Sequence, residues 1–277
     1  MKKFLLGILS ILLVFLSMTL VFSYTINDIC INTISSAVVK NEITSRLIDE
    51  IKNNYKDVSN KTLEDIETTI SNSDEINKIT EKYFNNIINY VSNKEELKLP
   101  STDKEIENII DEINSNTDNN KINISNSSKK KIIEYMNNDN LSKVYKTTAK
   151  NLKENLSDDQ AEVANFYNFF KSENTKIILV VAIIIDILLM MILLKSFYKW
   201  MVLTGSSLII SGGMLLIVVP LVANKISGVI TNELIGTSSS LNLNSINDFG
   251  YIMLLVGFVL MVLYFVINGF KKKIKEN

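Results

Sequence analysis

Apolar residues gather in four long runs, and a long polar segment separates the first run from the second. The runs extend approximately over 4–22, 176–194, 201–222 and 251–267. Each is close to the ~20 apolar residues that a helix needs to cross the hydrocarbon core of a bilayer. The pattern predicts an all-α membrane protein with one N-terminal transmembrane helix and three C-terminal transmembrane helices.

The polar segment, residues 24–175, carries apolar side chains at steps of three and four. The clearest stripes are Ile76, Ile79, Tyr83, Ile87 and Val91, followed by Ile106, Ile109, Ile110 and Ile113. No glycine lies between Gly7 and Gly205, and Pro100 is the only proline between them. Tight β-turns usually need glycine, whereas these spacings are typical of amphipathic helices. We therefore expect a helical bundle whose core is formed by the stripes, with a loop at 115–129.

Three pairs of residues in the polar segment resemble capping boxes, in which a side-chain oxygen accepts a hydrogen bond from the first helical turn. The pairs are Ser71 with Asp74, Thr102 with Glu105, and Ser157 with Gln160. At the end of the segment, residues 171–176 contain neither proline nor glycine. We therefore expect its last helix to continue directly into the second apolar run.

Lysines mark one end of every apolar run. Lys2 and Lys3 precede the first run, and Lys195 and Lys199 lie between the second and the third. The lysines after the fourth run are Lys271, Lys272, Lys273 and Lys275. Because short loops rich in lysine stay in the cytoplasm, we expect a multi-pass protein of the cell membrane with cytoplasmic N- and C-termini. The polar segment and the loop 223–250 would then be extracytoplasmic, and the turn 195–200 cytoplasmic.

The first run also resembles a signal peptide, because lysines precede it. It ends without a small-x-small cleavage site, so we expect residues 1–23 to remain as an uncleaved anchor. Cys30 is not preceded by a lipobox, and we expect no lipid attachment there. The other parts are then an extracytoplasmic helical domain at 24–175, a three-helix bundle at 176–270 and a basic cytoplasmic tail at 271–277.

Composition excludes several classes of function. The chain has no histidine and one cysteine, so it lacks the ligands of common zinc and haem sites and the members of common catalytic triads. The polar segment holds 19 Lys+Arg against 26 Asp+Glu, which argues against nucleic acid as a partner. No Walker, Rossmann or EF-hand pattern occurs. We expect neither a cofactor nor an enzymatic activity. Abundant Lys, Asn and Ile with a single arginine, Arg46, indicate an AT-rich bacterial genome.

Asp186 is the residue that most deserves a functional hypothesis, because it lies near the middle of the second apolar run. A charged side chain at that depth costs about 2.5–3.5 kcal/mol on insertion scales. Counted from the turn at 195–200, Ser211 in the third run lies at a similar depth, and Ser207 lies one turn away. We predict an intramembrane polar contact among Asp186, Ser207 and Ser211. A contact between copies of the chain, or the binding of a proton or ion, are the alternatives.

Small residues on the third run predict close helix packing. Gly205, Gly212 and Gly213 would form this packing face together with the two serines. Pro220 either kinks the third helix or marks its end. Asp248 is expected to cap the fourth helix. Only Asp186 is embedded in a run, so the chain cannot supply the aspartate pair of an intramembrane aspartyl protease.

The leading hypothesis is a non-enzymatic protein of the cell envelope whose external helical domain binds or scaffolds a partner. Its expected partners are the lipid bilayer and either a membrane or envelope protein or further copies of the chain. The alternative is a subunit of a transporter or channel in which Asp186 is protonatable. A membrane-bound enzyme using carboxylates of the polar segment is a third hypothesis, for which the sequence offers no residue pair.

Overall fold

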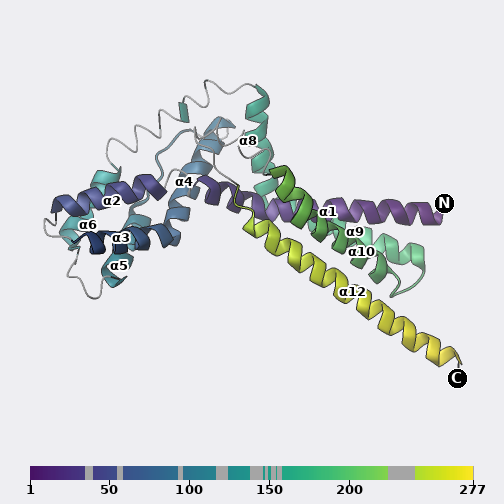
Figure 1. The fold of residues 1–277 in the computed structure, drawn as a ribbon. Coiled ribbons are helices and arrows are strands. Elements are labelled where there is room, and N and C mark those ends of the chain that lie inside the picture. The colour runs from purple at the N-terminus through teal and green to yellow at the C-terminus, as the bar shows by residue number, and fades with distance from the viewer. Residues whose placement is uncertain are drawn as a thin grey trace. The chain divides into compact units, whose positions relative to one another are not determined.

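The computed structural model describes residues 1–34, 40–54, 59–92, 96–116, 124–137, 146, 149–150, 154, 158–223 and 241–276. Within these ranges the regular elements are all helices and no strand occurs (Figure 1). The chain divides into two compact units. The first, called the apolar unit here, comprises Met1–Ile29, Phe169–Asn232 and Ser240–Asn277; the second, called the polar unit, comprises Cys30–Asn168 and Glu233–Ser239.

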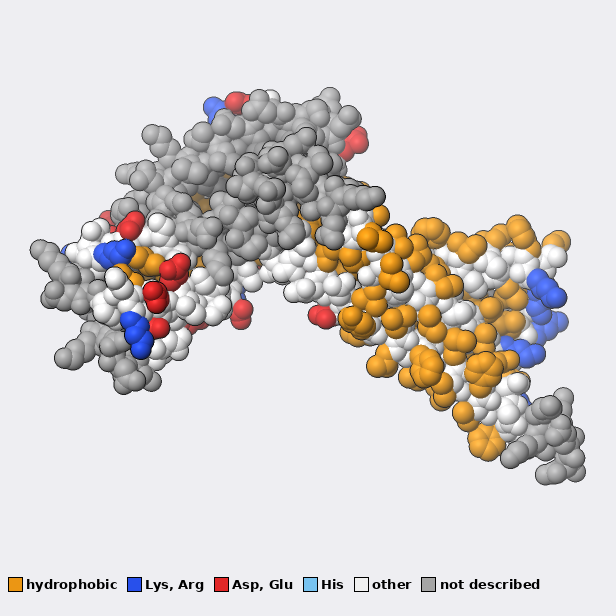
Figure 2. Space-filling view, viewed as in Figure 1, with side chains coloured by type: hydrophobic (Ala, Val, Ile, Leu, Met, Phe, Trp, Pro, Cys, Tyr) orange, Lys and Arg blue, Asp and Glu red, His pale blue; other side chains and the backbone are white. Residues whose placement is uncertain are grey.

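Four helical segments are long and apolar enough to cross a membrane: Lys2–Asn32, Glu173–Leu194, Trp200–Ala223 and Asn244–Lys271. They belong to α1 (Lys2–Ile34), α9 (Glu173–Leu194), α10 (Trp200–Gly213) with the π-helical turn η2 (Met214–Val218), and α12 (Asn244–Glu276). Large apolar side chains cover the outside of the apolar unit, and lysines gather at one end of it (Figure 2). For the residues that the structure describes, the prediction of helices without strands, four of them long and apolar, is confirmed.

The polar unit is built around a core that consists almost entirely of isoleucine. Its helices are α2 (Lys40–Asn54), α3 (Asn60–Asn72), α4 (Asp74–Val91), α5 (Asp103–Asn116), α6 (Asn126–Asn137) and most of α8 (Asp158–Lys171). The buried core residues are Ile43, Leu47, Ile51, Ile66, Ile70, Ile76, Ile79, Ile106, Ile109, Ile110, Ile113, Ile124 and Ile132. The apolar stripes of α3, α4 and α5 supply most of this core, as their spacing predicts.

Helix starts in the polar unit agree only in part with the predicted capping boxes. Ser73, not Ser71, caps α4, and its hydroxyl accepts a hydrogen bond from the backbone N–H of Glu75 at 3.3 Å. Ser71 lies in the last turn of α3, so the Ser71 prediction is wrong. α5 begins directly after Thr102, as expected. Ser157 lies outside the described residues.

One side chain fixes the far end of the segment that was predicted as a loop at 115–129. The amide of Asn114 donates to the carbonyl oxygen of Ile124 at 3.3 Å and accepts from its N–H at 2.9 Å. Ile124 is 1% exposed and belongs to the isoleucine core. The first residues of the predicted loop are helical, since α5 continues to Asn116, and residues 117–123 lie outside the described residues.

Pro220 neither ends the third apolar helix nor leaves it regular. The π-helical turn Met214–Val218 precedes it, and the N–H of Val219 donates to the carbonyl of Met214, five residues earlier. A proline clashes with the carbonyl four residues before it and offers no N–H of its own. The wider turn accommodates that clash, so the apolar segment continues to Ala223.

α12 begins earlier than the fourth apolar run. Its first residue is Asn244, so Asp248 lies inside the helix, after the first turn, and is exposed. The prediction that Asp248 caps this helix is therefore wrong. The earlier start has a local cause, because Asn242 accepts a hydrogen bond from the N–H of Asn244 at 3.1 Å.

Candidate functional site

α1, α9 and α10 enclose the interior of the apolar unit. Leu9 and Leu13 of α1 and Met190 of α9 are buried together, and Ile183 and Leu203 pack against them. Residues three and four apart share one face of a helix. Asp186 lies three residues after Ile183 and four before Met190, so its side chain is directed into this same interior.

Asp186 is buried and makes no hydrogen bond with the described residues. It is 2% exposed, and neither carboxyl oxygen has a hydrogen-bond partner. The hydroxyls of Ser10 on α1 and Thr204 on α10 are also buried and also have no partner. Each of the three helices therefore directs an unpaired polar group into the apolar unit, at a cost of roughly 1–3 kcal/mol for each unsatisfied group.

The two predicted partner serines bind α1 instead. Ser207 donates to the carbonyl oxygen of Ser10 at 3.1 Å. Ser211 donates to the carbonyl oxygens of Val14 at 3.4 Å and Ser207 at 2.8 Å. Sequence reasoning placed these serines against α9 because the two helices follow each other along the chain. Their contact with α1 joins residues almost two hundred positions apart and has no local signal in the sequence.

The burial of Asp186 limits which partners its carboxyl group could contact. A side chain that is 2% exposed inside its own bundle does not lie on the outer face that a second copy would contact. A proton or a small ion needs less space than a protein helix. The position of Asp186 therefore favours the binding of a proton or small ion within one chain over a contact between copies of the chain.

Glycines bring α10 and α12 into backbone contact. A Cβ atom on Gly205 would lie 2.7 Å from the carbonyl oxygen of Gly257, and one on Gly212 would lie 2.7 Å from that of Gly250. Gly213 has nothing within 4 Å at the same position. Two of the three predicted packing glycines therefore form the contact, and Gly213 does not. The partners Gly250 and Gly257 were missed, although they repeat the spacing of seven residues seen for Gly205 and Gly212.

The antiparallel register set by the glycines continues to the lysine-rich end of the unit. One further step of seven residues along each sequence pairs Tyr198, in the turn before α10, with Tyr264 of α12, and their rings stack at a centroid distance of 5.9 Å. The ammonium group of Lys271 lies 4.3 Å from the centroid of the Tyr198 ring. Cation–π contacts of this kind contribute about 0.5–1 kcal/mol at exposed sites.

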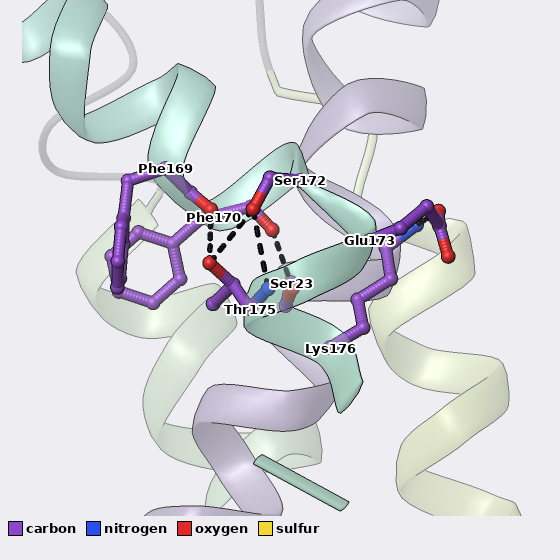
Figure 3. A network of polar contacts seen from close by, with 7 residues as sticks. All are labelled: Ser23, Phe169, Phe170, Ser172, Glu173, Thr175 and Lys176. Carbon is purple, nitrogen blue, oxygen red and sulfur yellow. Dashed lines mark hydrogen bonds and ion pairs between the residues drawn. The ribbon is translucent and has the colours of Figure 1, made fainter. Parts of the chain in front are cut away.

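A hydrogen-bonded junction joins α1 to the end of α8, which is in turn bonded to the start of α9 (Figure 3). Ser23 of α1 donates to the carbonyl oxygen of Phe170. Thr175 donates to the carbonyl oxygen of Phe169 at 2.6 Å, and Ser172 accepts from the N–H of Thr175 at 3.2 Å. We call these five residues the stem. The stem holds the part of α1 around Ser23 beside the end of α8 and the start of α9.

Aromatic and charged contacts reinforce the stem. The rings of Phe22 and Phe170 meet edge to face at 5.6 Å, and the ammonium group of Lys176 lies 4.9 Å from the centroid of the Tyr24 ring. Ser172 has an extended backbone, φ −67° and ψ 138°, and caps α9. The expectation that the last polar helix continues into the second apolar run is therefore wrong. Ser172 with Thr175 is the sequence signal that marks the break.

The polar unit has a surface hollow of about 410 Å³. It lies between the end of α3, the start of α4 and the end of α5. Its lining side chains are all polar: Thr68, Thr69, Asn72, Ser73, Asp74, Glu112 and Asn116. Two carboxylates among hydroxyls and amides can accept hydrogen bonds from a basic or hydroxylated ligand. Sequence reasoning did not identify this hollow, because its residues come from three separate stretches.

A half-buried tyrosine and a salt bridge join α4 to the start of α5. Burial raises the pKa of Tyr83 above its usual value, and a hydrogen bond with Thr102 opposes that shift. The ammonium group of Lys82 lies 2.7 Å from the carboxylate of Glu105 and donates to the carbonyl oxygen of Ser101 at 2.8 Å. These contacts fix the start of α5 against α4.

The arrangements described above offer carboxyl, hydroxyl, amide and ammonium groups for hydrogen bonding and proton binding. In the residues that the structure describes, no group of three or more His, Cys, Asp or Glu side chains is placed to hold a metal ion. The stem, the hollow and the interior around Asp186 are three arrangements that bear on function. No protein-family model, curated protein or solved structure matches this chain.

Proposed function

We propose that this chain is a non-enzymatic membrane protein of the bacterial cell envelope that displays its polar unit outside the cytoplasm to bind or scaffold a partner protein. The four apolar helices would anchor it in the cell membrane. The lysine-rich end of the apolar unit, with Lys2, Lys199 and Lys271, would lie in the cytoplasm, because positive charge is retained there.

The stem is the observation that carries this proposal. Through the hydrogen bond from Ser23 to the carbonyl oxygen of Phe170, the stem holds the outer part of α1 beside the start of the second apolar helix, within the apolar unit. Capping by Ser172 and its hydrogen bond with the N–H of Thr175 add a fixed start to α9. A polar segment whose preceding and following apolar helices lie side by side suits a domain that is displayed on one side of a membrane.

The hollow lined by Asp74 and Glu112 is the part of the polar unit that we assign to partner contact. Acidic residues exceed basic ones in the polar segment, so the surface favours a partner with basic side chains. Charge complementarity of this kind guides encounter and selects partners.

The orientation can be tested with single cysteines on intact cells. Cys30→Ser provides a background without cysteine. We expect Lys104→Cys, at an exposed position of α5, to react with a membrane-impermeant maleimide. We expect Lys199→Cys to react only after the cells are permeabilised. Labelling of Lys199→Cys on intact cells, with Lys104→Cys protected, would overturn the proposed orientation.

Partner binding can be tested by crosslinking in native membranes followed by purification of the tagged full-length chain. We expect a stoichiometric partner protein that is retained by the wild type and lost in Asp74→Asn/Glu112→Gln. Glu107→Gln, an exposed acid on α5 outside the hollow, is the control and should retain it. Equal recovery from all three forms would show that the hollow is not the contact.

A second function is favoured by one observation, the unpartnered carboxyl of Asp186 inside the apolar unit. It supports a subunit of a transporter or channel in which this group takes up and releases a proton. Four helices are few for a complete transporter, so further subunits or copies would be needed. Under this reading, Asp186→Asn should abolish proton-coupled flux in reconstituted vesicles, whereas the exposed Asp248→Asn should not. Flux that is absent from the wild type rejects this function and leaves the first unaffected.

A further inference from the structure

A groove of about 600 Å³ runs along the apolar unit between the start of α1 and the end of α9. Its walls are formed by Phe4, Leu5 and Ile8 of α1 and by Ile192 of α9, and Lys2 and Lys195 lie at its mouth. Phe4 and Ile192 are 73% and 70% exposed, so the groove opens outward from the unit. Its volume lies within the ~300–1,000 Å³ range of sites for small molecules.

The charges around the groove have one sign. Residues 1–8, 190–202 and 262–271 contain lysines and no acidic residue, and the face drawn in the space-filling view shows basic but no acidic side chains at this end of the apolar unit (Figure 2). Within the described residues neither Lys2 nor Lys195 forms an ion pair. The apolar walls and the two free ammonium groups together fit a ligand with a hydrocarbon tail and an anionic head.

We propose that this groove binds one anionic phospholipid, with its phosphate between Lys2 and Lys195 and one acyl chain along Leu5, Ile8 and Ile192. The proposal needs the four helices to lie in a bilayer but does not depend on a partner protein or on Asp186. A transmembrane helix of another protein would also cover apolar walls. It would not, however, neutralise two lysines at the level where lipid phosphates lie.

The expected preference follows from the charges. A lysine near a membrane surface contributes about 1 kcal/mol to attraction of anionic lipid, so two lysines favour an anionic over a zwitterionic headgroup by roughly tenfold or more. The walls add apolar contact that both lipids share. Headgroup selectivity therefore tests the two lysines, whereas total lipid binding tests the apolar walls, and separate variants are used for each.

Native mass spectrometry of the full-length chain in mixed micelles measures both the headgroup preference and the total lipid retained. We expect the wild type to retain one dioleoyl phosphatidylglycerol and to bind it roughly tenfold more tightly than dioleoyl phosphatidylcholine. Lys2→Gln/Lys195→Gln should reduce that ratio to near one. Lys3→Gln/Lys199→Gln removes the same charge from neighbouring positions outside the groove and should leave the ratio unchanged.

The acyl-chain part is tested by filling the groove. Ile8→Trp should weaken the retention of both lipids. Ile11→Trp, at a position of α1 that is 61% exposed and outside the groove, should not. A wild type without headgroup preference would overturn the proposal. So would an equal loss in the two double-lysine variants, because the preference would then come from the basic end as a whole.

Discussion

Gly205 and Gly257 are in backbone contact, and neither position has room for a side chain. A Cβ on Gly205 would lie 2.7 Å from the carbonyl oxygen of Gly257, and a Cβ on Gly257 would lie 2.6 Å from that of Gly205. The obstacle is backbone in both directions, so it cannot rotate away. Close approach of this kind is how small residues hold helices together where no hydrophobic force drives them together in lipid.

We therefore expect Gly205→Ala to destabilise the apolar unit by about 1–3 kcal/mol, the usual cost of overpacking. Gly213→Ala is the matched control, because nothing lies within 4 Å of its Cβ position. Thermal unfolding of the purified chain in mild detergent measures both. Equal melting temperatures for the two variants would mean that α10 and α12 do not pack through these glycines.

Replacement of Asn114 should loosen the polar unit. Its side chain makes two hydrogen bonds to the backbone of Ile124, so Asn114→Ala leaves a buried N–H and a carbonyl without partners. We expect a loss of about 1–3 kcal/mol in the free energy of unfolding. The exposed Asn116→Ala is the control. Hydrogen exchange should rise first at α6, next to Ile124, and unchanged protection there would contradict this role.

The cap of α9 should stabilise the stem. Ser172→Ala removes the oxygen that accepts from the N–H of Thr175. A lost N-cap costs about 0.5–2 kcal/mol. We expect faster proteolysis around 169–176 in Ser172→Ala and no change in Ser206→Ala, whose hydroxyl bonds only within its own helix. If both variants are cleaved at the wild-type rate, the cap does not hold the junction.

The stability of Asp186→Leu shows whether the carboxyl group of Asp186 has a structural role, which would stabilise the fold, or a functional role that lowers stability. Because neither oxygen has a partner, an apolar side chain of similar size should raise stability, by roughly 1–3 kcal/mol. Ser211→Leu should lower it, since that hydroxyl bonds to α1 and the position is fully buried. A melting temperature that falls in Asp186→Leu would indicate a structural hydrogen bond or ion made by this carboxyl.

Tyr83 should make stability depend on alkaline pH. Burial raises its pKa, so the folded chain holds the phenol proton more tightly than the unfolded chain does. This contribution is complete below the ordinary value of 10.0 and is lost as the pH rises through the folded-state pKa. The fall in stability above that value should be shallower in Tyr83→Phe than in the wild type. Tyr251→Phe, which removes an exposed phenol, should retain the steep fall.

The sequence alone determined the elements that depend on local pattern. Long runs of apolar residues specify helices that lie in a membrane, so the four apolar helices followed directly from the sequence. Apolar residues at steps of three and four specify a helix with one buried face, so the isoleucine core followed as well. Ile106, Ile109, Ile110 and Ile113 lie in the core because α5 has only one apolar face to bury. The position of Asp186 near the middle of the second apolar run followed from the same reasoning, but the face of α9 that it occupies did not.

Tertiary structure decided which faces meet. Ser207 and Ser211 bind α1, which is remote in sequence, and only the packing of the bundle selects α1 over the neighbouring α9. The spacing of seven residues in Gly205 and Gly212 was visible, but its match with Gly250 and Gly257 depends on the register of two antiparallel helices. The cap of α4 depended on where the preceding helix ends. Because α3 continues through Ser71 to Asn72, only Ser73 is extended between the two helices, and Ser73 rather than Ser71 caps α4.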